Sequence, residues 1–126
     1  MKCGRSKQPR KESWMARYLI SFDRGAMDHI PDEERPAVGE AAHAAVQEAI
    51  DAGVFVFAGG VHDGVSVVAA DGTVEDAPQN KAYIGGLTIV DVASREDALE
   101  WAAKIAAACR CAQEFRAIMP DPAVGN

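Results

Sequence analysis

The chain has 126 residues, of which 48% are hydrophobic, and a formal net charge of −6 at pH 7. That length suits one ordinary domain with a single core. No apolar run approaches the ~20 residues that a membrane-spanning helix needs, and the basic N-terminus lacks the apolar segment of a secretory signal.

The charge is unevenly distributed along the chain. Residues 1–14 hold five of the 13 basic residues and one of the 19 acidic ones, so the remainder carries a net charge of −10. An acidic domain is a poor nucleic-acid binder, because phosphate contacts need a basic face. We expect residues 1–14 to be a disordered basic extension, or to precede a natural start at Met15, and they could touch an acidic partner. A single domain is expected over residues 15–126.

The first half of this domain reads as a strand followed by a helix. The strand is Ala16–Asp23, where apolar and polar side chains largely alternate. After a loop, Asp32 is a plausible helix N-cap, and Pro36 is tolerable in a first turn whose N–H groups lack partners. Gly53 is placed to end the helix. The apolar stripe of the helix consists of Val38, Ala41, Ala42, Ala45, Val46, Ala49 and Ile50.

A short strand and a hairpin are expected next. The strand, Val54–Val61, is apolar on both faces. Asp71-Gly72 between Val65–Ala70 and Thr73–Asp76 predicts a two-residue turn in which both positions have a positive φ. Pro78 should end this ladder because it has no N–H to donate.

Ala82–Val92 is apolar in both of its alternating sets, which is typical of a central strand covered on both faces. Gly85-Gly86 within it predicts a β-bulge or a close approach by another group. Two helices can cover one face of such a sheet, so the apolar residues of the other face predict an interface. We therefore expect a homodimer that pairs by sheet faces. The two alternating sets of the strand are Ala82, Ile84, Thr88, Val90 and Val92 on one face, and Tyr83, Leu87 and Ile89 on the other.

The last elements are a helix and a strand. Ser94 with Asp97 three residues later resembles a capping box, and apolar residues recur at helical spacing after it. Cys109–Met119 alternates apolar and charged residues and is expected to be the closing strand. Cys109 and Cys111 would then share one strand face, which is a poor disulfide geometry. We expect the three cysteines to be reduced thiols in a cytoplasmic protein.

A series of motifs runs through the second half of the chain. It comprises Asp76, Pro78, Lys81, Gly85, Gly86, the helical segment Asp97–Ala102 (DALEWA), and Glu114, Phe115, Arg116 and Met119. In this order, over roughly Ala16–Met119, they resemble the YCII-related family, often called DGPF proteins. Ala77 stands where the family has Gly, and Gln79 where it has Phe. The resemblance implies an α+β, ferredoxin-like (βαβ-βαβ) fold with an antiparallel sheet, two helices on one face and a dimeric α/β barrel. Most members of the family have no established activity.

No phosphate-binding loop, nucleophile elbow, zinc motif or dinucleotide fingerprint is present. The three histidines lack metal-ligand spacing, so we expect no cofactor and no metal. His43 and Asp51, two turns apart on the first helix, are the first candidate catalytic pair. A histidine near the sheet could act as a general base. The related YCII branch places a histidine and an acid on this helix, although that histidine aligns with Ala42. The alternative is a solvent-facing histidine.

Two further groups of residues are candidates. Asp76 is a possible acidic partner for His43, and Pro78 holds a rigid loop between it and Lys81. The alternative for these three is a turn with solvated charges. Arg110 and Arg116 on the closing strand could line an anion-accepting cavity inside the dimer, or face water and discourage edge-to-edge aggregation.

Two classes of function remain open. One is an enzyme acting by proton transfer on a small organic acid or lactone, by analogy with isomerases, lyases and dehalogenases of similar fold. The other is a non-catalytic protein that binds a small molecule or regulates a partner, since DGPF proteins are often encoded beside sigma factors. A buried histidine or carboxylate beside a cavity would favour the enzyme, whereas a binding protein needs only the cavity or an exposed patch. We expect no contact with membranes.

Overall fold

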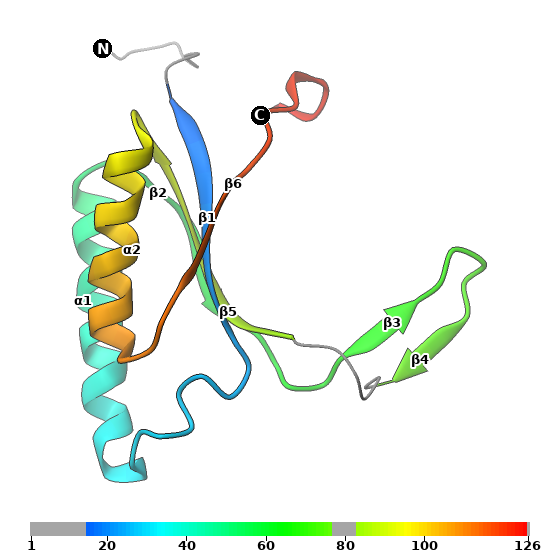
Figure 1. Cartoon of the computed structure of the whole chain (residues 1–126), viewed down its shortest axis with the longest axis horizontal. Helices are drawn as coiled ribbons and strands as arrows, with labels where there is room; N and C mark the ends of the chain where they lie inside the picture. Colours follow the sequence, from blue (N-terminus) through cyan, green and yellow to red (C-terminus); the bar gives the residue numbers. More distant parts are fainter. Residues whose placement is uncertain (1–14, 77–82, 126) are drawn as a thin grey trace.

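The computed structural model describes residues 15–76 and 83–125 of the chain (Figure 1). Four strands form one antiparallel sheet in the order β2-β5-β1-β6, and two more, β3 and β4, form a separate hairpin. The fold is α+β, with two helices and an antiparallel sheet, and is compatible with the expected ferredoxin-like architecture. The elements are β1 (Ala16–Asp23), η1 (Asp32–Glu34), α1 (Arg35–Asp51), β2 (Phe55–Gly60), β3 (Ser66–Val68), β4 (Val74–Asp76), β5 (Ile84–Val92), α2 (Arg95–Cys109), β6 (Glu114–Ala117) and η2 (Pro122–Val124).

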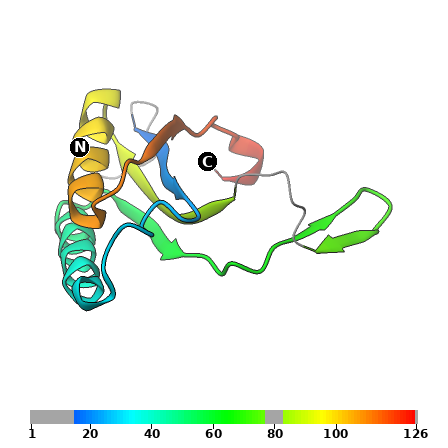
Figure 2. The same ribbon diagram turned by 60° about the horizontal axis from the view of Figure 1, so that its bottom comes forward.

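Both long helices lie on the same side of the sheet, while the β3–β4 hairpin extends away from the body (Figures 1 and 2). The core lies between α2 and the central strands β1 and β5. Ile20 and Val90 are fully buried there, and complete burial of such a side chain contributes roughly 1.5–3 kcal/mol. Small residues are buried on both helices, which allows a close approach. These residues are Ala45 and Ala49 of α1 and Ala98 and Ala102 of α2.

The predicted faces of the central strand are confirmed over residues 87–92, whereas Ile84 is exposed and Ala82 lies outside the described residues. Thr88, Val90 and Val92 of β5 are buried toward the helices, whereas Leu87 and Ile89 on the opposite face are half-buried. The bounds of β1 also agree with the prediction. No helix in the described part of the chain is long and apolar enough to cross a membrane.

The two glycines of β5 form the expected irregularity. Phe22 of β1 pairs with Gly86, but the next residue, Asp23, pairs with Ile84, which leaves Gly85 as an extra residue in the ladder. A Cβ atom on Gly86 would lie 2.5 Å from Cζ of Phe22. Both predicted alternatives therefore hold, since the strand bulges and an aromatic ring lies against the glycine.

The helix ends agree with the sequence in two of three places. Gly53 follows α1 with φ of +76°, and Oγ of Ser94 accepts a hydrogen bond from the Asp97 N–H (3.1 Å) at the start of α2. The prediction of Asp32 as N-cap is wrong. It begins the short helix η1, and the N-cap of α1 is Glu34, which has no side-chain cap among the described residues.

The hairpin exists, but the prediction of a two-residue turn is wrong. Gly72 has a positive φ of +90°, whereas Asp71 does not. The Gly72 N–H donates to the carbonyl of Ala69 (2.9 Å), and the Ala69 N–H donates to that of Thr73 (2.8 Å). This is a three-residue loop with glycine at its left-handed position. The Asp71 carboxylate accepts a hydrogen bond from the Thr73 N–H (2.9 Å), and hydrogen bonding with Thr73 lowers the pKa of Asp71.

The predicted closing strand, Cys109–Met119, is too long. Cys109 is the last residue of α2, Arg110 follows with φ of +57°, and β6 covers only Glu114–Ala117. Cys109 is buried because it continues the apolar stripe of the helix, which contains Ala98, Ala102 and Ile105. Burial raises the pKa of the thiols of Cys109 and Cys111. Because Cys109 ends α2 and Cys111 precedes β6, the two thiols do not share a strand face.

Candidate functional site

A cavity of about 480 Å³ lies between α1 and the helix-facing side of the sheet. Its volume falls within the range typical of small-molecule sites. Its wall is built by α1, the ends of β1 and β2, the middle of β5 and the C-terminal turn of α2. The cavity therefore lies at one side of the core, where α1 does not close fully onto the sheet.

Most of the cavity wall is apolar. The rings of Phe22 and Phe55, from β1 and β2, line it together with aliphatic side chains of the helices, among them Val38 and Ile105. Three glycines also line it, one from α1 and two from β2: Gly39, Gly59 and Gly60. A wall of this kind favours the apolar part of a ligand, and the glycines leave space that side chains would otherwise fill.

Four polar or charged side chains with hydrogen-bonding groups line the cavity within the described residues: Arg35, His43, Thr88 and Gln113. The described lining contains no carboxylate. Nε2 of Gln113 lies 3.5 Å from both the carbonyl oxygen and the sulfur of Cys111, so its amide is held against the segment that follows α2. Thr88 is buried within the sheet.

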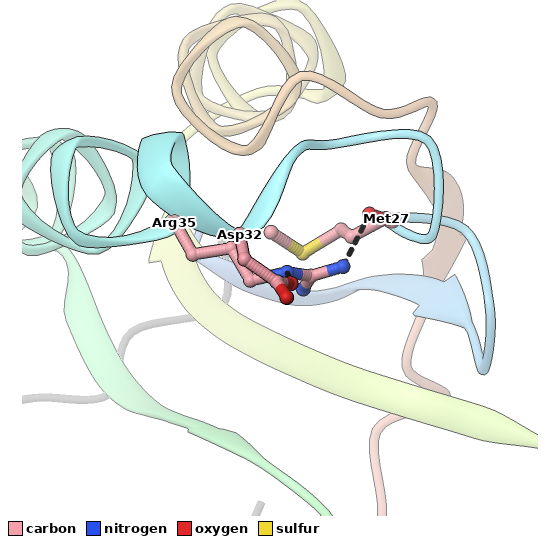
Figure 3. A network of polar contacts seen from close by, with 3 residues as sticks. All are labelled: Met27, Asp32 and Arg35. Carbon is pink, nitrogen blue, oxygen red and sulfur yellow. Dashed lines mark hydrogen bonds and ion pairs between the residues drawn. The ribbon is translucent and has the colours of Figure 1, made fainter.

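Arg35 is the one permanently charged group among the described lining residues. Figure 3 shows its side chain running from the start of α1 to the loop residue Met27, which also lines the cavity. Nη2 of Arg35 donates to the Met27 carbonyl (3.2 Å), and its Nε lies 3.3 Å from Oδ1 of Asp32. The Asp32 side chain is 99% exposed, so this ion pair contributes little stability by itself. Both contacts orient the guanidinium toward the chain that precedes α1.

The structure does not bring His43 and Asp51 together. His43 lines the cavity, although the residue as a whole is exposed. Eight residues of helix separate the two side chains by about 12 Å along the axis. The Asp51 carboxylate instead accepts a hydrogen bond from Nε2 of Gln47 (2.9 Å) and is not part of the cavity wall.

Asp76 also lies away from the cavity. It is in β4 of the hairpin that extends from the body (Figure 2), and Oγ of Ser66 donates to its carboxylate at 2.6 Å. Pro78 and Lys81, the other members of this predicted group, lie outside the described residues. Asp76 is therefore not placed to act with His43 within one chain.

The two arginines predicted to line a cavity have other partners. Arg110 is at the end of α2 rather than on a strand, and its guanidinium pairs with the carboxylate of Glu34 just before α1. Arg116 is exposed on β6, in register with Leu19 of β1, and lies 2.9 Å from the Glu114 carboxylate. Neither arginine lines the cavity described above.

Sequence reasoning missed Arg35, Gly39 and Gln113. Arg35 and Gly39 could have been noticed in the sequence, because each is an unfavourable residue for its position in a helix. A positive charge in the first turn opposes the helix dipole, and a glycine in the helix interior weakens the helix. Gln113 carries no such signal, since it follows the helix at a place that only the folded chain defines.

No family model matches this chain, and none of the curated proteins is significantly similar to it. The described residues also contain no group of three metal-ligating side chains that could hold an ion. The assignment of a function therefore rests on the cavity and on the residues in its wall.

Proposed function

We propose that this protein binds a small organic molecule in the cavity between α1 and the sheet. The observation that carries the proposal is an apolar cavity of about 480 Å³ with a few polar groups at defined places in its wall. Apolar burial supplies the affinity of such a site, and the polar groups orient the ligand.

A thermal-shift screen of small organic acids and lactones on the full chain tests this proposal. We expect some of them to raise the melting temperature, because a ligand that binds the native state stabilises it. The same compounds should not stabilise Gly39→Leu, which places a leucine side chain into the cavity. Ala44→Leu is the matched control, since Ala44 is exposed on the same helix and does not line the cavity. Equal responses of both variants would refute the cavity as the site.

A second candidate function is an enzyme that moves a proton on the bound molecule. The observation that favours it is His43 in the cavity wall, where an imidazole could act as a general base. For a ligand with a C–H group next to a carbonyl, we expect exchange of that hydrogen for deuterium in D₂O, measured by NMR. His43→Gln should abolish exchange and leave binding intact. If exchange at the wild-type rate persists in the variant, His43 is not the base.

We also propose that the fold is ferredoxin-like and that two copies pair through the sheet faces opposite the helices. The strand order β2-β5-β1-β6 supports the first part. The second part is supported by apolar residues on that face, which include the half-buried Leu19 and Ile89 and the largely exposed Phe57. Apolar surface of this kind is stabilised by burial in an interface.

A further inference from the structure

The guanidinium of Arg35 has hydrogen-bonding capacity to spare. It carries five N–H groups, and its contacts among the described residues are those with Met27 and Asp32. Even with one N–H used for each, the remaining groups include a pair on neighbouring nitrogens. Such a pair binds both oxygens of a carboxylate. The hydrogen bond to the Met27 carbonyl restrains the side chain in part, which reduces the rotamer entropy lost on binding.

Gly39 lies one helical turn after Arg35, on the same face of α1. It is in the interior of the helix, where alanine would be more stable. A Cβ atom at this position would meet no other atom within 4 Å outside its own helix backbone and chain neighbours. Packing against the rest of the protein thus does not require a glycine here. The space that its missing side chain leaves belongs to the cavity, which Gly39 lines.

Two locally unfavourable residues therefore face the same cavity, one supplying charge and the other space. Proteins tolerate such departures from local preference mainly at functional sites. The charge at Arg35 opposes the helix dipole, and its exposed ion pair with Asp32 offsets only part of this cost. A bound anion near the helix N-terminus would be favourable. A ligand with an anionic end at Arg35 and an apolar body beside Gly39 would offset both costs.

We propose that the ligand is a small carboxylic acid whose carboxylate binds Arg35 and whose apolar body lies against Gly39 and Phe55. This inference rests on the proposed binding function and specifies its ligand class. A single carboxylate fits better than a phosphate, because the described wall has one permanent positive charge and Asp32 already offsets part of it. The apolar body matches a wall that includes two phenylalanine rings.

The test uses phenylacetate and phenylacetamide, which have the same shape and differ in charge, with benzylphosphonate as a more highly charged third probe. Each is titrated into the full chain, and chemical-shift changes of the cavity residues are followed by NMR. We expect phenylacetate to bind at least ten-fold more tightly than the amide and more tightly than the phosphonate. Arg35→Gln retains an N–H donor for the Met27 carbonyl but no charge, so it should remove the preference for phenylacetate over phenylacetamide. Arg116→Gln, on the face away from the cavity, should keep that preference.

The outcomes separate this inference from the proposed function. Equal binding of acid and amide in the cavity would overturn the carboxylate assignment and leave cavity binding supported. Tighter binding of the phosphonate would also overturn it. If the preference for the acid persists in Arg35→Gln, the carboxylate does not bind Arg35 and the inference is wrong. Loss of the preference in Arg116→Gln would place the anion on the opposite face and would also overturn it. If none of the three probes shifts the cavity residues, the inference fails, while the thermal-shift screen still judges the wider proposal.

Discussion

The ring of Phe22 lies directly over Gly86, so that a Cβ atom on this glycine would be 2.5 Å from Cζ of the ring. The two residues are paired across β1 and β5, one residue before the ladder becomes irregular. Phe22 also lines the cavity, and its position therefore sets part of the cavity's shape. The missing side chain at Gly86 is what lets the aromatic ring lie against the strand there.

The first prediction is that Gly86→Ala destabilises the protein by about 1–3 kcal/mol, because the added methyl group overpacks a buried contact. Urea unfolding measures this change. Gly64→Ala is the matched control, since a Cβ atom there meets nothing within 4 Å and its φ is not positive. A cost for Gly86→Ala no larger than that of the control would show that the ring moves aside freely.

The second prediction concerns Gly39→Ala. Alanine stabilises the interior of a helix by about 0.5–1 kcal/mol relative to glycine, and the new methyl group meets no protein atom within 4 Å. We therefore expect a higher free energy of unfolding together with weaker binding of any cavity ligand. Urea unfolding and NMR titration measure the two effects separately. A gain in stability without a loss of affinity would mean that Gly39 does not make room for the ligand.

The third prediction compares two serines. Ser21 is fully buried, and its Oγ has no hydrogen-bond partner among the described residues. A buried hydroxyl without a partner costs about 1–3 kcal/mol, so Ser21→Ala should raise the free energy of unfolding by about 1 kcal/mol. Ser94→Ala removes the N-cap bond to the Asp97 N–H and should lower it by a similar amount. Destabilisation by both substitutions, measured in urea, would mean that the Ser21 hydroxyl has a partner in solution.

The sequence predicts those features that depend on neighbouring residues. The alternation in Ala16–Asp23, the serine cap at Ser94 and the paired glycines of β5 are each encoded within a few positions. The cap and the glycines agree with the structure, and the alternation agrees except at Ser21, a polar position that is fully buried. The sequence wrongly assigns Cys109 to the closing strand, because this residue fits both a helical and a strand pattern. It continues the helical stripe of α2 and also alternates with the charged residues that follow.

The candidate site was harder to predict, because a cavity is a property of how α1 packs on the sheet. Arg35 looks like an ordinary surface charge until the fold places Met27 beside it. The separation of His43 from Asp51, by contrast, follows from helix geometry alone, since eight residues span about 12 Å. The hydrogen bond between Gln47 and Asp51 at a spacing of four residues shows which polar contacts such a helix permits.

The last prediction concerns self-association. If two copies pair through the sheet faces opposite the helices, Phe57 is a central candidate, because it pairs with Ile89 on the central strand and is 57% exposed in the single chain. A charge buried in an apolar interface is costly, so Phe57→Glu should convert a dimer into a monomer. Light scattering at micromolar concentration measures this change. Val68→Glu, at an exposed position on the hairpin, is the control and should leave the mass unchanged. A monomeric wild-type chain would refute the pairing, and an unaltered dimer in Phe57→Glu would place the interface on another surface.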